Sequence, residues 1–186
     1  METHSLVCHP DTPAKSVEAV EVRFARSLSG HLAVTYVAIS KLGSIRIPAP
    51  PAAQPCRADD LWKTTCFEAF ACCQDGTGYY EFNFAPSGDW AAYGFASRRA
   101  GMADAPIDPP SIAVTCDPHR LEVAVAADLG ELAGLSQHAS WTLSLTAVIE
   151  ENGGAKSYWA LAHPPGEPDF HDPACFTALL PAPDYP

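Results

Sequence analysis

Residues 78–90 read GYYEFNFAPSGDW, and this stretch decides the fold. Successive side chains of an extended strand point to opposite faces of a sheet, so the odd-numbered side chains from Tyr79 to Asn83 share one face. The even-numbered ones from Tyr80 to Phe84 share the other. The Pro-Ser-Gly-Asp sequence that follows favours a tight turn into another strand. The all-aromatic face is therefore predicted to be core, and the polar face is predicted to carry a site.

The same alternation recurs on both sides of this stretch, whereas a helical period is almost absent. Further strands are predicted at residues 20–25, 32–38, 64–73, 90–97, 112–116, 121–126, 141–150, 157–163 and 175–180. About ten strands at this spacing are typical of an all-β, single-domain β-sandwich of the jelly-roll or immunoglobulin-like kind, here covering residues 1–186. One short helix is expected at residues 128–135, with Asp128 as its N-cap, and the proline-rich residues 43–55 are expected to form a long loop.

Composition and charge limit the kinds of partner. Of the 186 residues, 47% are hydrophobic and 18% are charged, which supplies enough apolar surface for a core and excludes global disorder. The formal net charge of −11 repels phosphate backbones and anionic lipids, so neither nucleic acid nor a membrane is an expected partner. Charged residues interrupt the apolar runs near the N-terminus, which favours a cytoplasmic protein.

The cysteines favour a reduced protein. They are seven, an odd number, and none are spaced as CxxC. This pattern argues against a disulfide framework and against a zinc ribbon. We expect mostly structural thiols, because free cysteine behaves as a small buried hydrophobe.

The polar face of the central stretch has the composition of a small-molecule pocket. A carboxylate and a carboxamide can hydrogen-bond hydroxyl groups, while tyrosine and tryptophan rings cover an apolar ring surface. We therefore expect a small-ligand-binding domain whose ligand is a carbohydrate or a similar polyhydroxylated or cyclic molecule. The predicted ligand-binding residues are Glu68, Tyr79, Glu81, Asn83, Trp90, Arg98 and Trp159. Asn83 is expected to be an exposed pocket amide that contributes little to stability.

Residues 61–102 resemble the DOMON-like and family 9 carbohydrate-binding domains. The likeness rests on the Leu-Trp pair at residues 61–62, on the strand CFEAF at residues 66–70, and on the tyrosine-rich strand that ends in Pro-Ser-Gly. Residues 157–163 and the Asp-Phe-His sequence at residues 169–171 match more loosely.

The resemblance implies a β-sandwich that holds a sugar end or a haem on one concave sheet face. The positions that match the family's site are Glu68, Glu81, Asn83, Trp90, Arg98 and Trp159. Two departures stand out. Thr64 and Thr65 occupy the place where the family often has an acidic residue, and family members that bind sugar or haem are commonly exported.

Several side chains have two interpretations. Glu68 either contacts a ligand or is a buried carboxylate that pairs with Lys63, Arg98 or Arg99. The adjacent arginines either clamp an anion or form internal ion pairs. The aromatic residues expected in the core are Trp62, Trp141 and Tyr80.

Two rival functions would use the same region. An enzyme would pair a buried carboxylate with an imidazole as acid and base, and its candidate catalytic residues are Glu68, Glu81, His163 and His171. A haem-binding redox domain would use Met102, the only internal methionine, as an iron ligand, although CxxCH is absent. No metal site is expected, and its weaker candidate ligands are Met102, His163, Asp169 and His171. The identity of the ligand and the oligomeric state are not readable from the sequence.

Overall fold

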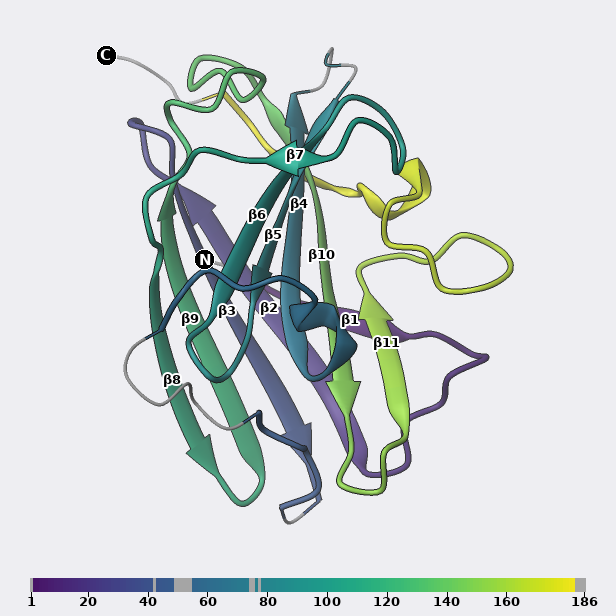
Figure 1. Cartoon of the computed structure of the whole chain (residues 1–186). Coiled ribbons are helices and arrows are strands. Elements are labelled where there is room, and N and C mark those ends of the chain that lie inside the picture. Colours follow the sequence, from purple (N-terminus) through teal and green to yellow (C-terminus); the bar gives the residue numbers. More distant parts are fainter. Residues whose placement is uncertain (1, 42, 49–54, 74–75, 77, 183–186) are drawn as a thin grey trace.

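The computed structural model describes residues 2–41, 43–48, 55–73, 76 and 78–182. In this part of the chain, twelve strands form a curled antiparallel sheet, accompanied by two single-turn 3₁₀ helices, η1 (Leu61–Lys63) and η2 (Pro173–Cys175). The strands, drawn in Figure 1, are β1 (Thr3–Cys8), β2 (Val17–Arg26), β3 (His31–Ser40), β4 (Cys66–Cys73), β5 (Tyr79–Phe84), β6 (Trp90–Phe95), β7 (Ala103–Asp104), β8 (Ser111–Asp117), β9 (Arg120–Asp128), β10 (Trp141–Glu150), β11 (Lys156–Ala160) and β12 (Ala178–Leu180).

The sheet has two halves that are joined through β1. The strand order is β7-β6-β5-β4-β10-β11-β1-β2-β3-β9-β8, and β12 pairs with β10 beside this path. The first part of β1, from Thr3 to Leu6, pairs with β2, whereas Val7 and Cys8 pair with β11. A single strand therefore passes from one half of the sheet to the other.

The two halves face each other across the main core. The hydroxyl of Tyr36, in β3, donates a hydrogen bond of 2.6 Å to the backbone carbonyl of Glu68, in β4. The ring of Tyr36 also lies 5.1 Å from that of Phe67, measured between centroids. Side chains from both halves form one continuous apolar cluster. Their burial supplies the main driving force for folding, since apolar surface removed from water is the largest favourable contribution.

The outer face of the half that contains β4, β5 and β6 is also buried. A second apolar cluster covers it and includes Phe70, Tyr79, Tyr93 and Phe95 together with Phe170, which comes from the segment after β11. A strand that is buried on both faces reads as a nearly continuous apolar run, as β4 does apart from Glu68. This outer face is where the polar side chains of the central stretch lie.

The all-β prediction is confirmed, and so is the alternation in the central stretch. Phe82 and Phe84 belong to the core between the halves, and Tyr79 belongs to the outer cluster. The predicted turn follows β5, where Gly88 has a φ of 92° that favours glycine. Strands β1 and β7 were not predicted, because β1 begins with three polar residues and β7 has only two residues.

The helix expected at residues 128–135 is wrong. Asp128 is the last residue of β9, and its Oδ1 accepts the backbone N–H of Gly130 at 3.0 Å, which makes a turn instead of a helix cap. Gly130 and Gly134 lower the helix propensity of the segment. Its three leucines are buried in the core, so packing favours an irregular series of turns.

The remaining expectations concern segments beside the sheet. The loop at residues 43–55 includes an isolated bridge between Ile45 and Glu151, and its residues 49–54 lie outside the described part of the chain. All seven cysteines are free. Among the described residues, no helix is long and apolar enough to cross a membrane.

Candidate ligand-binding site

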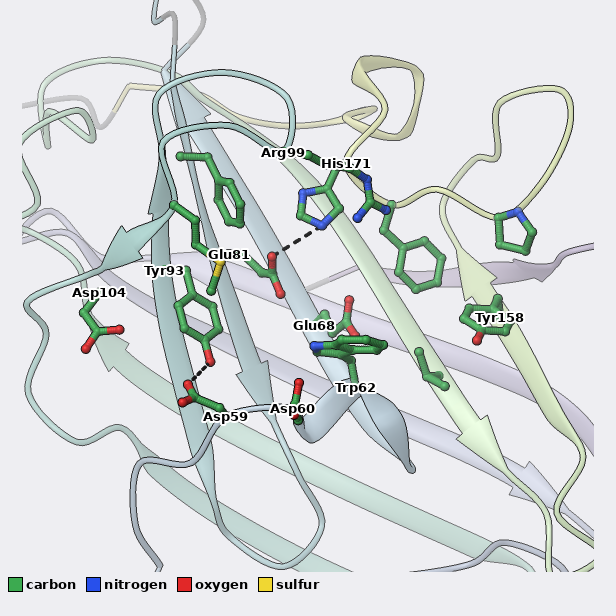
Figure 2. A pocket seen from close by; sticks show the side chains of 15 residues that line it. Asp59, Asp60, Trp62, Glu68, Glu81, Tyr93, Arg99, Asp104, Tyr158 and His171 are labelled. Carbon is green, nitrogen blue, oxygen red and sulfur yellow. Dashed lines mark hydrogen bonds and ion pairs between the residues drawn. The ribbon is translucent and has the colours of Figure 1, made fainter.

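A cavity of about 730 Å³ lies on the outer face of β4, β5, β6, β10 and β11. Three segments outside these strands form its rim: residues 59–62, residues 99–104 and residues 168–171. Figure 2 shows the lining residues, which are Asp59, Asp60, Trp62, Glu68, Glu81, Tyr93, Phe95, Arg99, Met102, Asp104, Val148, Tyr158, Pro168, Phe170 and His171. The cavity thus combines aromatic rings with an excess of carboxylates.

Two buried carboxylates from neighbouring strands form part of the lining. Glu68 is 3% exposed, and its Oε2 accepts a hydrogen bond of 3.4 Å from the Thr146 hydroxyl, whereas its Oε1 has no partner. Glu81 is 6% exposed, and its Oε1 accepts a hydrogen bond of 2.7 Å from the Asn83 amide. Burial raises the pKa of both groups, and the charge of Glu81 raises the pKa of Glu68 further.

His171 connects this pair to the rim. Its Nε2 lies 3.6 Å from Oε2 of Glu81, and its Nδ1 lies 2.7 Å from the hydroxyl oxygen of Tyr79. That oxygen accepts the backbone N–H of Arg99 at 3.1 Å. Burial, together with the charge of Arg99, lowers the pKa of His171 to about 4. The imidazole is therefore neutral near pH 7.

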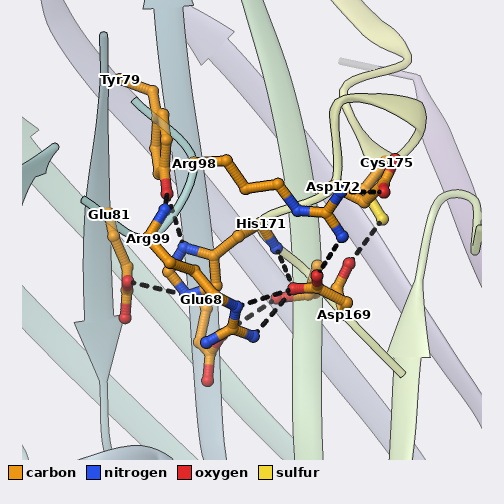
Figure 3. Close-up of polar contacts among 10 residues, drawn as sticks. Glu68, Tyr79, Glu81, Arg98, Arg99, Asp169, His171, Asp172 and Cys175 are labelled. Carbon is orange, nitrogen blue, oxygen red and sulfur yellow. Dashed lines mark hydrogen bonds and ion pairs between the residues drawn. The ribbon is translucent and has the colours of Figure 1, made fainter. Parts of the chain in front are cut away.

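Two arginines hold the segments of the rim together, as Figure 3 shows. Arg98 forms ion pairs with Asp169 and, at 2.8 Å, with Asp172, and Arg99 donates to Asp169 at 2.8 Å. Although burial alone raises the pKa of Asp169, the hydrogen bonds from the two arginines lower it to about 2. Of the two interpretations of this arginine pair, the structure favours internal ion pairing over a clamp for an anion.

The aromatic part of the lining comes from four separate segments. Trp62 was expected in the core, but its side chain projects from η1 outside the sheet, and the residue is 47% exposed. Tyr93, in β6, donates a hydrogen bond of 2.5 Å to Asp59 through its hydroxyl. Tyr158 comes from β11 and Phe170 from the segment after it. These rings supply apolar faces beside the carboxylates.

The predicted site residues lie in three different environments. Glu68 and Glu81 line the cavity, and Tyr79 and Asn83 are buried behind it with hydrogen bonds to lining residues. Arg98 lies outside the lining, with a half-exposed side chain that pairs with Asp169. Trp90 and Trp159 belong to the core between the two halves of the sheet. They share that face because Trp90 pairs with Phe84 and Trp159 pairs with Ala147 in the ladders, so their rings do not reach this cavity.

Asn83 is not the exposed amide that the sequence suggested. It is 1% exposed, its amide donates to Glu81, and its Oδ1 lies 3.6 Å from the Cys66 sulfur, which donates to it. The alternation of the strand was correct, but the outer face is covered by the segments of the rim. Asn83 therefore holds the Glu81 carboxylate in position through a hydrogen bond, and it does not itself line the cavity.

The candidate metal and catalytic residues are also dispersed. His171 and Met102 line the cavity, whereas Asp169 is held by the arginines. His163 lies elsewhere, with its Nε2 2.8 Å from the carbonyl oxygen of Val7 and its ring against that of His9. Within the described ranges, no three metal-ligating side chains gather in one place.

The fold of the chain resembles two solved structures. One is described as a "putative carbohydrate-binding protein" from Bacteroides uniformis, with 15% sequence identity and a TM-score of 0.62 over 97% of this chain and 85% of that chain. Another is a carbohydrate-binding module of family 9 from Caldicellulosiruptor kristjanssonii in complex with glucose, with 9% identity and a TM-score of 0.47 over 83% of this chain and 71% of that chain. No protein-family model and no curated protein matches the chain.

The first of these neighbours shares the all-β fold that the resemblance at residues 61–102 implies. Neither structure is described as a DOMON domain, so the DOMON part of the resemblance has no support from them. At 15% identity, the first likeness establishes the fold.

Sequence reasoning missed several residues of the lining, among them Trp62, Tyr93, Tyr158 and the aspartates of the rim. One of them had a usable signal. Tyr93 pairs with Glu81 across the β5–β6 ladder, so a correct register for the hairpin would have placed both on one face. The others depend on loops whose positions a local pattern does not encode.

Acidification is expected to destabilise the protein through His171. The folded chain holds the pKa of this group at about 4 against an ordinary value of 6.5, so protonation favours the unfolded chain. The contribution of His171 is therefore complete above pH 6.5 and is lost as the pH falls toward 4, by up to about 3 kcal/mol. Glu68 and Glu81 act in the opposite direction, because a raised pKa stabilises the folded chain at low pH.

Thermal melts of wild type and of His171→Gln between pH 4 and pH 7 separate these contributions, since the carboxylates remain in both proteins. The variant should lose less stability on acidification. Parallel pH profiles would show that His171 takes up its proton as readily in the folded chain as in the unfolded one.

Proposed function

We propose that this chain is a carbohydrate-binding domain that holds a sugar in the cavity on the outer face of the β4–β5–β6 half. The observation that carries the proposal is the joint presence, around one cavity of about 730 Å³, of aromatic rings and buried carboxylates. A sugar has apolar ring faces, which pack on aromatic rings, and hydroxyl groups around its edge, which form hydrogen bonds. Sites for such ligands combine aromatic surfaces with a few fixed polar groups.

The individual side chains suit that task. The ring of Trp62 is accessible at the rim, and Tyr158 lines the same cavity, so both can cover the apolar face of a pyranose. Glu68 and Glu81 can accept hydrogen bonds from hydroxyl groups, and Glu68 keeps an oxygen without a partner for this purpose. Asn83 and Tyr79 hold the polar groups in position.

The comparisons support the proposal at the level of architecture. We propose that the curled sheet is a β-sandwich of the family 9 kind, because its two halves pack face to face across one core. The neighbour from Bacteroides uniformis, which shares the fold, is itself described as a putative carbohydrate-binding protein. A sugar-like ligand is the partner that fits both observations.

An enzyme is the second candidate, and the contact between His171 and Glu81 favours it. A neutral imidazole 3.6 Å from a buried carboxylate with a raised pKa is a pair that can exchange a proton with a ligand. If the protein cleaves the sugars that it binds, reducing ends accumulate in a prolonged incubation, and their absence limits the function to binding.

A panel of neutral and amino sugars tests the proposed function directly. Titration followed by calorimetry and by tryptophan fluorescence should detect binding of at least one of them, because Trp62 lies at the cavity. Failure of every mono- and disaccharide of the panel to bind at millimolar concentration would remove the proposal.

A further inference from the structure

The lining of the cavity carries more negative than positive charge. It includes five carboxylates, those of Asp59, Asp60, Glu68, Glu81 and Asp104, and one cationic side chain, that of Arg99. The guanidinium of Arg99 is already bound to Asp169 at 2.8 Å. His171 adds no charge near pH 7, since its pKa is about 4. The cavity therefore favours a positively charged guest over an anionic one.

The carboxylates at the rim have partners of their own. Asp60 forms an ion pair with Lys63 at 2.6 Å, and Asp104 forms one with Arg57 at 3.1 Å. Asp59 accepts the hydroxyl of Tyr93. These aspartates contribute to the negative electrostatic potential of the cavity, but each already has a partner in the protein and needs none from a ligand.

Glu68 is different, because it is buried and incompletely paired. Among the described residues, no cationic group lies within 4 Å of its carboxylate, its Oε2 has a single long contact with Thr146, and its Oε1 has none. Figure 2 shows this side chain in the cavity together with Glu81 from the adjacent strand. A buried polar atom without a partner is costly, and a buried carboxylate costs more.

A cationic group at this position would satisfy both carboxylates. Burial raises the pKa of both carboxyl groups, and the charge of Glu81 raises the pKa of Glu68 further. An ammonium that donates a hydrogen bond to the free Oε1 opposes this by stabilising the charged forms. The rings of Trp62, Tyr93 and Tyr158 line the same cavity, and aromatic faces attract cations. Lys63 already lies over the ring of Trp62 and Arg57 over that of Tyr93, whereas Tyr158 carries no such contact among those described. A neutral hydroxyl supplies the hydrogen bond alone and leaves the charges unbalanced.

We propose that the ligand is an amino sugar, whose protonated primary amine is bound by Glu68 with Glu81 beside it. This inference rests on the proposed function, because it names the class of sugar that the same cavity takes. The amine distinguishes the ligand from a plain hexose and from its N-acetylated form, in which the nitrogen carries no charge.

Glucosamine, N-acetylglucosamine and glucose, with their β-1,4-linked dimers, test the inference in wild-type protein. They share one ring and differ at a single substituent. We expect the amino sugar to bind at least tenfold more tightly than either neutral counterpart, which is the difference that one charge-assisted hydrogen bond makes.

The variant Glu68→Gln keeps the shape of the side chain and removes its charge. We expect the preference for the amino sugar to fall to within about twofold, while neutral sugars keep a similar affinity. Glu150→Gln is the matched control, because Glu150 is a buried carboxylate of β10 that does not line the cavity, and it should retain the full preference. Thermal melts establish that both variants fold.

The outcomes separate the two proposals. Equal binding of glucose and glucosamine, or an unchanged preference in Glu68→Gln, overturns the assignment of the amine and leaves carbohydrate binding intact. If these three sugars and their dimers fail to bind to the wild type, the inference fails, and if every other sugar of the panel fails as well, the proposed function fails with it. Should Glu68→Gln not fold, the comparison of the three sugars on the wild type decides the question alone.

Discussion

Replacing Phe84 by alanine is expected to lower the free energy of unfolding by about 3–5 kcal/mol, the usual cost of removing a buried phenylalanine ring. Phe84 is 1% exposed and lies between the two halves of the sheet, where it pairs with Phe67 across the β4–β5 ladder. Its removal leaves a cavity that the surrounding strands cannot fill without shifting. Chemical denaturation, monitored by tryptophan fluorescence, measures the change.

The adjacent residue provides the control for this experiment. Asn83→Ala removes the amide that donates to Glu81, and it should cost a smaller amount, about 1–3 kcal/mol, because the partner oxygen loses its hydrogen bond. The two substitutions sit next to each other but on opposite faces of β5. A larger loss for Asn83→Ala than for Phe84→Ala would mean that the assignment of the core face is inverted.

Replacing Trp62 by alanine is expected to weaken sugar binding by roughly 10- to 100-fold with little change in stability. Trp62 is 47% exposed at the rim of the cavity, so the folded chain gains little from its ring. A ligand that stacks on the ring buries about 100 Å² of apolar surface, which corresponds to roughly 1.5–3 kcal/mol. Titration with the sugar that binds wild type most tightly measures the loss, and a thermal melt monitors stability.

Leu179→Ala is the matched surface variant, because Leu179 is an exposed apolar residue of β12 outside this cavity. Its sugar affinity should equal that of wild type. If Trp62→Ala binds sugar as tightly as Leu179→Ala does, the ligand does not contact the rim that η1 forms, and the proposed site has to be moved.

The fold class and the central strand were predictable because strand periodicity is local. Phe82 and Phe84 face the core and Tyr79 faces outward for a reason contained in six consecutive residues. The short helix expected at residues 128–135, with Asp128 as its N-cap, does not form. There the two glycines lower the helix propensity, and the three leucines are buried in the core by a series of turns.

The sequence by itself determined that the chain is all-β and which side chains of β5 share a face, since both follow from the period of a strand. Only the tertiary structure decided which outward side chains meet at the cavity. Trp62, Arg99 and His171 lie on three segments that approach each other because β4, β5, β6, β10 and β11 are neighbours in the sheet. Strand order and loop positions result from long-range packing, so they cannot be read from the local alternation of residues.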